Sequence, residues 1–328
     1  MMFSTVGVVA RWAVPFLTVA AVAGATFSGP GLAVRLIDDA NPLAGHALYV
    51  DPTSAAMAAA HKTDPPSAEL DAIANTPQAF WVDPAVTSDR VARYVGAAQA
   101  AGGMPMLALY AIPHRDCGSF AAGGFATAAE YRQWIDGVSA ALGSSPAAVI
   151  LEPDALDMAD CLSPGQRDER FGLIRYGVDT LTRDPAAAVY IDAGHSRWKS
   201  ADEISARLNQ VGVDHARGFS LNTSNFYTTG EEIDYGEKVS GLTKGAHYVV
   251  DTSRNGAGPA PDAPLNWCNP DGRALGTPPT TATAGAHADA YLWIKRPGDS
   301  DGACGRGDPG PGHFVNQYAI DLARSAHQ

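Results

Sequence analysis

Residues 147–154 read AAVILEPD, five apolar residues in a row followed directly by two carboxylates that flank a proline. An unbroken apolar run of this length is typical of a strand that is buried on both faces of a parallel sheet. Polar residues that follow such a strand lie at its carboxyl end, where parallel α/β folds place their binding sites. This stretch therefore predicts a buried strand with functional groups at its end.

The same pattern recurs six more times along the chain. The other apolar runs cover residues 78–82, 104–112, 187–191, 218–221, 247–250 and 290–294. Amphipathic segments lie between them, at residues 88–101, 127–142, 164–182, 200–211 and 230–242. Seven strands that alternate with helices predict an α/β fold, a distorted seven-stranded parallel β/α barrel of the TIM type in a single domain. An open doubly wound sheet is the alternative, but neither GxGxxG after the first strand nor GxxxxGK[ST] occurs.

Composition limits the kind of partner. The 328 residues carry 35 acidic and 23 basic side chains, a formal net charge of −12, with no block of lysine or arginine. Phosphate recognition needs a basic face, so we expect no nucleic-acid binding. Neutral ligands such as sugars fit this charge better.

The first 33 residues have the order of a secretory signal. They contain no acidic residue and one basic residue, Arg11, before an apolar run over residues 13–27 and a small, helix-breaking segment. We expect a signal peptide at 1–33, cleavage near Ala33, and a secreted catalytic domain at 34–328 without stable membrane association. A retained anchor is the alternative, although the apolar run is shorter than the roughly 20 residues of a membrane span.

Four cysteines fit an exported chain. Their even number predicts disulfides, and three pairings are open from the sequence alone, among Cys117, Cys161, Cys268 and Cys304. The absence of a CxxC pair argues against a zinc knuckle. The nine histidines are scattered, with no HExxH and no close pair, so we expect neither a metal nor another cofactor.

Nearly every predicted strand ends in a carboxylate or an amide. Carboxylates crowded at one rim raise one another's pKa, which places a protonated acid beside an ionised base. Glycoside hydrolysis uses such a pair, one carboxyl group to protonate the leaving oxygen and one to act on water or the sugar. Aromatic residues at or beyond strand ends are candidate stacking platforms for a sugar chain: Trp81, Tyr110, Trp198 and Trp267. We assign Trp134 and Trp293 to the core.

Seven markers in order resemble glycoside hydrolase family 6, the cellulase family of endoglucanases and cellobiohydrolases. They are Tyr110 with RDCG at 115–118, EPDAL at 152–156, DAGHS at 192–196, NTSN at 222–225, DTSRNG at 251–256, NWC at 266–268, and WIK at 293–295 with PG at 297–298 and DG at 301–302. The resemblance implies a distorted seven-stranded barrel that hydrolyses β-1,4-glucan with inversion. It also implies the sequential disulfide pairs.

The resemblance assigns roles to individual residues. Asp154 resembles the general acid, Asp116 the neighbour that keeps it protonated, and Asp301 the proposed base. Tyr110 would lie by the sugar ring at the cleavage point, and Asp192 matches a supporting carboxylate. The substrate-binding set that it implies comprises Trp81, Trp198, Trp267, Asn222, Asn225, Lys295, Asp299 and His195, with Arg254 in a structural ion pair.

Two departures from the family pattern bear on activity. Ala121 and Ala122 stand where a serine often holds the attacking water, and Asp299 stands where glutamate is common. The chain has little length to spare for loops that would roof a cleft, so we expect an open cleft and internal cleavage. A monomer is expected as the usual state of a secreted hydrolase. The alternatives are a catalytically impaired glucan-binding protein on the same scaffold and a cellobiohydrolase.

Overall fold

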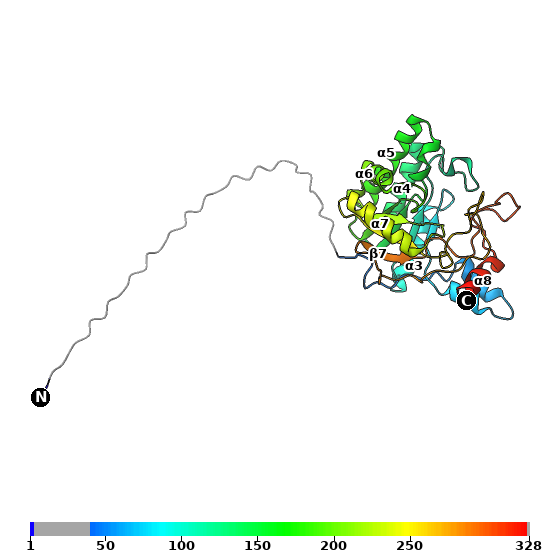
Figure 1. Ribbon diagram of the computed structural model, residues 1–328, viewed down its shortest axis with the longest axis horizontal. Coiled ribbons are helices and arrows are strands. Elements are labelled where there is room, and N and C mark those ends of the chain that lie inside the picture. The colour runs from blue at the N-terminus through cyan, green and yellow to red at the C-terminus, as the bar shows by residue number, and fades with distance from the viewer. Residues whose placement is uncertain (3–39, 327–328) are drawn as a thin grey trace. The chain divides into compact units, whose positions relative to one another are not determined.

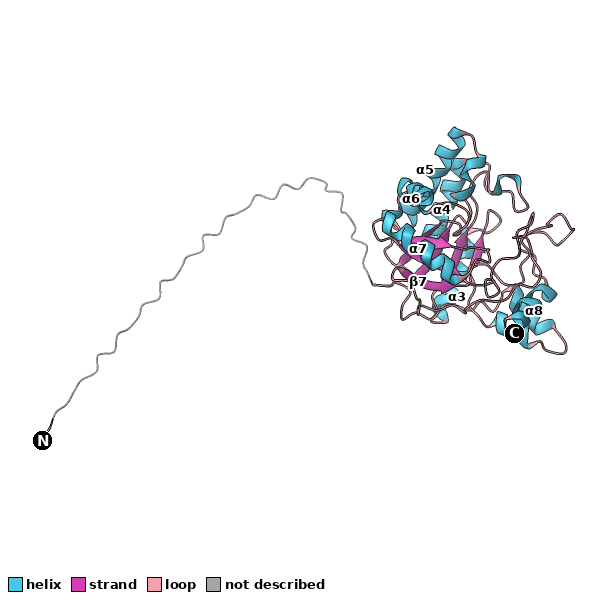
Figure 2. Cartoon of the chain, in the orientation of Figure 1, coloured by secondary structure: helices cyan, strands magenta, loops and turns pink. Residues whose placement is uncertain are grey.

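Seven parallel strands pair in chain order in the computed structural model, which describes residues 1–2 and 40–326. The predicted cleavage site near Ala33 and residues 3–33 of the predicted signal lie outside the described residues. The strands are β1 (Phe80–Val82), β2 (Met106–Leu109), β3 (Ala147–Leu151), β4 (Ala187–Asp192), β5 (Gly218–Leu221), β6 (His247–Asp251) and β7 (Ala288–Leu292). Figure 2 shows them at the centre of the folded part, with helices around them.

Eight α-helices and three short 3₁₀ helices accompany the described strands. They are α1 (Ala55–Lys62), α2 (Ala68–Ala74), α3 (Ser88–Ala100), η1 (Asp116–Gly118), α4 (Ala128–Leu142), η2 (Asp157–Cys161), α5 (Pro164–Leu181), α6 (Ala201–Gln210), η3 (Val213–His215), α7 (Thr229–Leu242) and α8 (Asn316–Ser325). In residues 40–326, none of these helices has the length and apolar character to cross a bilayer.

Side-chain alternation explains the unbroken apolar runs. In β3, Ala148 and Ile150 belong to the apolar cluster inside the sheet's curl, whereas Val149 and Leu151 belong to the cluster under the helices. Both faces of the strand are therefore buried, and period-two polarity disappears from the sequence. The prediction of buried parallel strands is confirmed.

Helix starts follow the local capping residues. Thr127 accepts a hydrogen bond from the backbone N–H of Glu130, whose carboxylate accepts one from the Thr127 N–H, the capping box that begins α4. Ser163 caps α5, with Pro164 as its first helical residue. The capping residues Thr127 and Ser163 therefore mark the positions at which α4 and α5 begin.

The sheet curls into an incomplete barrel, so the predicted barrel is confirmed in its nearly closed form. Within the described residues no ladder joins β7 to β1. One backbone bond, from Ala79 N–H to the Trp293 carbonyl at 3.0 Å, and one from the Trp81 indole to the Ile294 carbonyl at 2.9 Å cross this seam. The strand β7 begins and ends two residues before the predicted run, because Trp293 and Ile294 make these seam contacts instead of ladder pairs.

A third apolar cluster lies beside the seam. It gathers α1, α2 and α8 around Trp293, whose side chain is buried. Figure 1 shows α8 near the blue N-terminal helices of the folded part. The two short helices α1 and α2 precede the first strand of the barrel.

Both sequential disulfides are present, Cys117–Cys161 and Cys268–Cys304. The first ties the loop after β2 to the loop after β3. The second ties the long β6–β7 connection to the loop after β7. Each bridge therefore fastens two neighbouring loops at the carboxyl ends of the strands.

Candidate active site

Asp154 lies just beyond the carboxyl end of β3 in a backbone conformation that residues other than glycine seldom adopt. Its φ is +67°, in the left-handed region, and its N–H donates to Asp192 Oδ1 at 2.9 Å. The side chain is half-buried. Burial raises the pKa of Asp154 well above its usual range, and the charges of Asp192 and Asp116 raise it further, while Lys295 opposes them. The carboxyl group is therefore held protonated, as a general acid requires.

Asp192 is the last residue of β4, and its carboxylate holds the backbone of Asp154 in place. Its side chain is 1% exposed and accepts four hydrogen bonds. The donors are Asp154 N–H and Gly194 N–H on one oxygen, and the hydroxyls of Ser220 and Thr223 on the other. Burial raises the pKa of Asp192 to about 6, although these donors lower it. Asp192 supports Asp154 without facing solvent.

Asp116 and Tyr110 form the next part of the rim. The Tyr110 hydroxyl donates to Asp116 Oδ1 at 2.5 Å, and the Arg115 guanidinium lies 4.3 Å from the Tyr110 ring centre. Burial raises the pKa of Asp116, whereas the Tyr110 hydrogen bond and Arg115 lower it. Trp81 meets the Tyr110 ring edge-on at 5.3 Å. Asp116 is thus hydrogen-bonded to Tyr110, and Trp81 packs against this pair through the Tyr110 ring.

Asp301 has the opposite surroundings. Arg254 Nη1 lies 2.8 Å from one carboxylate oxygen and Lys295 Nζ lies 2.9 Å from the other. The N–H of Asn269 donates a further bond at 3.1 Å. Although Asp301 is buried, the two cations lower its pKa to about 2. Asp301 therefore stays ionised until the pH falls to about 2.

Lys295 links the two carboxylates electrostatically. It pairs with Asp301 and lowers the pKa of Asp154, so the acid side and the ionised side belong to one site. Its Nζ also lies 3.3 Å from the Ser300 carbonyl. A sugar bound by Lys295, as predicted, would have to share the ammonium group with Asp301.

The loop after Asp116 places the two alanines that depart from the family pattern. The Ala121 carbonyl accepts from Arg115 Nε at 2.9 Å, and the Ser119 carbonyl accepts from Ala122 N–H at 3.0 Å. Those carbonyls are occupied by the loop itself. The Ser119 side chain is exposed at the tip of this loop.

Predicted aromatic platforms differ in their surroundings. Trp198 is half-buried beside His195, with 5.3 Å between ring centres, and His195 stacks on Tyr227 at 4.2 Å. Burial lowers the pKa of His195 to about 4, so the imidazole is neutral. Trp267 is 40% exposed and lies 6.1 Å from the Phe120 ring. Trp293 is buried in the apolar cluster beside the seam, and Trp134 is partly buried against the cluster under the helices. Both tryptophans belong to the core, as expected.

Two of the predicted sugar contacts are buried within the protein. Asn222 is fully buried, and its amide bonds to the Tyr227 backbone and the Asp251 carbonyl. Asp299 is 2% exposed and pairs with Arg296 at 2.5 Å. The amide atoms of Asn222 are used in hydrogen bonds to backbone groups, and the carboxylate of Asp299 pairs with Arg296. Neither side chain therefore presents a group to a ligand. Asn225, by contrast, is half-buried.

Sequence reasoning missed several carboxylates that support the rim from inside. Glu152 is 1% exposed and accepts from the N–H groups of Ala111 and Ile112, which follow β2. Asp251 accepts from four N–H groups of the loops after β5, β6 and β7. Both residues lie inside the sequence motifs that resemble family 6. A single acidic residue after an apolar run does not show, however, whether its side chain faces solvent or backbone N–H groups.

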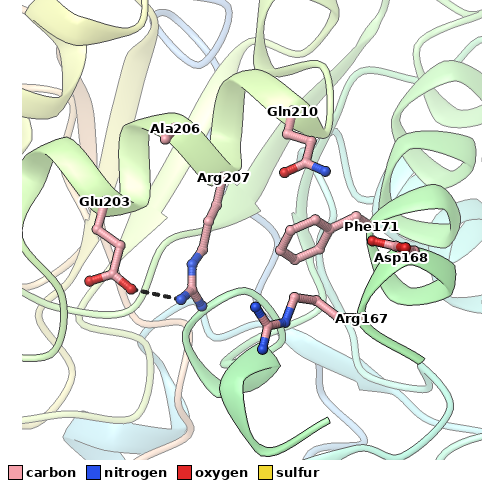
Figure 3. A pocket seen from close by; sticks show the side chains of 7 residues that line it. All are labelled: Arg167, Asp168, Phe171, Glu203, Ala206, Arg207 and Gln210. Atoms are coloured by element: carbon pink, nitrogen blue, oxygen red, sulfur yellow. Dashed lines mark hydrogen bonds and ion pairs between the residues drawn. The ribbon is translucent and has the colours of Figure 1, made fainter. Parts of the chain in front are cut away.

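A hollow of about 400 Å³ lies elsewhere, on the outer side of the helices (Figure 3). It is lined by α5 and α6, and the figure shows Phe171 at its wall and Glu203 paired with Arg207. None of the strand-end carboxylates lines it, so it is not the candidate site. Among residues 40–326, no group of three or more histidine, cysteine or acidic side chains is arranged to hold a metal ion.

Comparisons with known proteins agree with this geometry. The model of glycosyl hydrolases family 6 matches residues 43–326. Endoglucanase A of Cellulomonas fimi is 47% identical over 85% of this chain, which spans 61% of that relative's length. Endoglucanase A of Thermobispora bispora is 41% identical over 93% of this chain and 68% of that protein.

Solved structures agree as well. The endoglucanase Cel6 from Mycobacterium tuberculosis, determined in complex with a methyl-cellobiosyl-4-deoxy-4-thio-β-cellobioside, has a TM-score of 0.87 and 73% identity. The alignment covers 88% of this chain and all of that one. The strand order, the acidic rim and these matches together place the chain in glycosyl hydrolases family 6.

Proposed function

We propose that this protein is a secreted endo-β-1,4-glucanase that inverts the anomeric centre. One observation carries the proposal: at the carboxyl ends of the strands, burial and neighbouring charge raise the pKa of Asp154, whereas Asp301 is ionised by its pairing with Arg254 and Lys295. One protonated and one ionised carboxyl group are the equipment of inverting glycoside hydrolysis.

In the proposed reaction, Asp154 gives its proton to the glycosidic oxygen as the bond to the anomeric carbon breaks. A water molecule attacks from the opposite face, and Asp301 accepts its proton. Arg254 and Lys295 make Asp301 a weak base, because they stabilise its charge before the reaction begins. Asp116 keeps the acid protonated by its charge, and Tyr110 lies beside the sugar ring.

Internal cleavage is supported by the names of the relatives. The two curated relatives described above and the Mycobacterium tuberculosis protein are all endoglucanases. Relatives described as probable cellobiohydrolases match at 29% identity. The proposed substrate is a β-1,4-glucan, and the proposed acting species is a monomer.

Export is proposed on two grounds. The sequence of residues 1–33 has the order of a secretory signal, and all four cysteines are paired in disulfides. Disulfides of this kind persist outside the reducing cytosol. Mass spectrometry of the protein recovered from a culture medium tests this, and a mature form that retains Met1 would contradict it.

The deciding experiment follows viscosity and reducing ends together on soluble carboxymethylcellulose, with the wild type beside Asp154→Asn. A fast fall in viscosity with few new ends, lost in the variant, is expected. Release of ends without a fall in viscosity would indicate a cellobiohydrolase. Glucan binding without hydrolysis by the wild type would indicate the binding protein, with Ala121 and Ala122 as the first positions to restore to serine.

A further inference from the structure

Asp157 is a buried carboxyl group that the proposed reaction does not use. It opens η2, three residues after Asp154, and its side chain is 2% exposed. Neither carboxylate oxygen has a hydrogen-bond partner within the described chain, residues 40–326. Every other buried carboxylate on this side of the rim, such as Asp192 and Glu152, accepts several hydrogen bonds.

An ionised carboxylate without a hydrogen-bond partner at this buried position would strongly destabilise the folded state. Burial raises the pKa of Asp157 well above its usual range, and the charge of Asp192 raises it further. The charged or titratable groups that face Asp157 are Asp154, Asp192, Lys199, Glu203, Arg207 and Tyr235. The two cations do not compensate for the burial, because they pair with Asp160 and Glu203 at the surface.

Asp157 is packed against one particular backbone segment. A Cβ placed on Gly194 would lie 2.5 Å from Asp157 Oδ2 and 2.8 Å from Oδ1. Gly194 has a φ of +63°, and its N–H donates to the same Asp192 oxygen that accepts from Asp154 N–H. The carboxyl group therefore lies under the turn at residues 192–195 and fills the space that a side chain at Gly194 would need.

We propose that Asp157 is a positioning residue of the general acid: its neutral carboxyl group supports the turn at Gly194, and the turn holds Asp192 and thereby Asp154. This inference rests on the proposed function. Two properties matter, the volume of the carboxyl group and its lack of charge. If the volume of the Asp157 carboxyl group is lost, the turn at residues 192–195 loses its support and water enters the space beneath Asp192. Asp154 is then displaced and more exposed to water.

The test compares Asp157→Asn with Asp157→Ala. Asparagine keeps both shape and neutrality, so its kcat and the alkaline limb of its pH–rate profile should match the wild type. Alanine removes the support, so kcat should fall about tenfold with KM nearly unchanged, since small misplacements of reacting groups have effects of this order. Its alkaline limb should also move to lower pH. Asp160→Asn, in the same 3₁₀ helix but at the surface, is the matched control and should leave the limb in place.

Two results would overturn the proposal. If Asp157→Asn moves the alkaline limb as far as alanine does, Asp157 acts through a negative charge. If both variants lower only the melting temperature, its role is limited to folding. An infrared difference spectrum of wild type minus Asp157→Asn provides a readout that needs no activity and remains decisive if the alanine variant does not fold. It should contain a protonated-carboxyl band at pH 6, and a carboxylate band there would refute the neutral form. Inactive wild type would instead refute the proposed function.

Discussion

The β3–β4 side of the rim and the β6–β7 side carry the same functional group in opposite surroundings. Asp154 lies among other carboxylates, Asp192 and Asp116, and its pKa is raised. Asp301 lies between Arg254 and Lys295, and its pKa is lowered to about 2. Both are poorly solvated, so burial alone does not set the proton state. The difference shows that neighbouring charge decides which aspartate holds a proton and which does not.

The largest expected effect comes from removing the proton on the acid side. Asp154→Asn should lower kcat on soluble β-1,4-glucan by about 10³-fold, within the range usual for general acids. A cellobioside with a dinitrophenolate leaving group needs no protonation, so its hydrolysis should lose far less. Steady-state kinetics on both substrates check this, with Asp136→Asn as a surface control. Equal losses on both substrates would mean that Asp154 does not act as the acid.

The second-largest effect is expected at Asp301, which lies between the cations Arg254 and Lys295. Arg254→Met leaves Asp301 with Lys295 alone, so the pKa of Asp301 should rise and the acid limb of the pH–rate profile should move to higher pH. Because Arg254 is fully buried, the variant should also lose about 3 kcal/mol of unfolding free energy, as is usual when one partner of a buried pair is removed.

Denaturant unfolding and a pH series measure the two effects of Arg254→Met separately. Arg296→Met is the matched control, since Arg296 pairs with Asp299 and not with Asp301. An acid limb that stays in place in Arg254→Met would separate Asp301 from the rate-limiting protonation.

The same contrast predicts how stability depends on pH. Burial raises the pKa of Glu232, which accepts from Ser196 N–H beneath the Trp198 loop, to about 7 from an ordinary value of 4.5. A raised acid contributes stability that is fully present below pH 4.5 and is lost as the pH rises through about 7, a loss of about 3 kcal/mol at most. Asp301, with a lowered pKa, contributes stability that is lost only as the pH falls from about 4 toward 2.

Glu232→Gln should therefore flatten the fall in unfolding free energy between pH 5 and pH 7. Urea titrations at intervals of half a pH unit measure the slope. Asp160→Asn removes a carboxyl group whose pKa is lowered to about 2, so its slope in this range should equal that of the wild type. An unchanged slope in Glu232→Gln would show that Glu232 is already ionised at pH 5.

The smallest effect concerns binding without proton transfer. Trp267 is 40% exposed next to Cys268, on the Asp301 side of the rim. Trp267→Ala should raise KM for long glucans several-fold with kcat nearly unchanged, because a stacking surface is lost and the carboxylates stay in place. Leu265→Ala, also exposed, should change neither constant. A fall in kcat would give Trp267 a part in the reaction step.

The fold could be predicted from the sequence because burial on both faces leaves an unbroken apolar run. β3 and β5 begin and end at the predicted residues for that reason. β7 could not be placed from the same signal, since Trp293 and Ile294 are as apolar as the strand but bond across the seam.

Predictions for the site were weaker because a strand-end polar residue can face either way. Asp192 is the last residue of β4 and Asn222 follows β5, and both side chains turn inward to hold backbone groups. Asp299 found a partner, Arg296, three residues earlier in its own loop. Asp157 left no sequence signal, since its importance depends on its contact with Gly194, 37 positions later.

The seam between β7 and β1 has a consequence for solubility. A closed barrel has no free strand edges, whereas this sheet has two, and an unpaired edge is a template for another chain. Here Thr280 covers part of the β7 edge by bonding to both backbone groups of Tyr291, and a single backbone bond joins Ala79 to Trp293 across the seam. The apolar cluster of α1, α2 and α8 packs around Trp293 beside it. We expect those three helices to protect the seam against edge-to-edge aggregation, although α8 also reaches the candidate site, where the Tyr318 hydroxyl lies 3.3 Å from Arg254 Nη1.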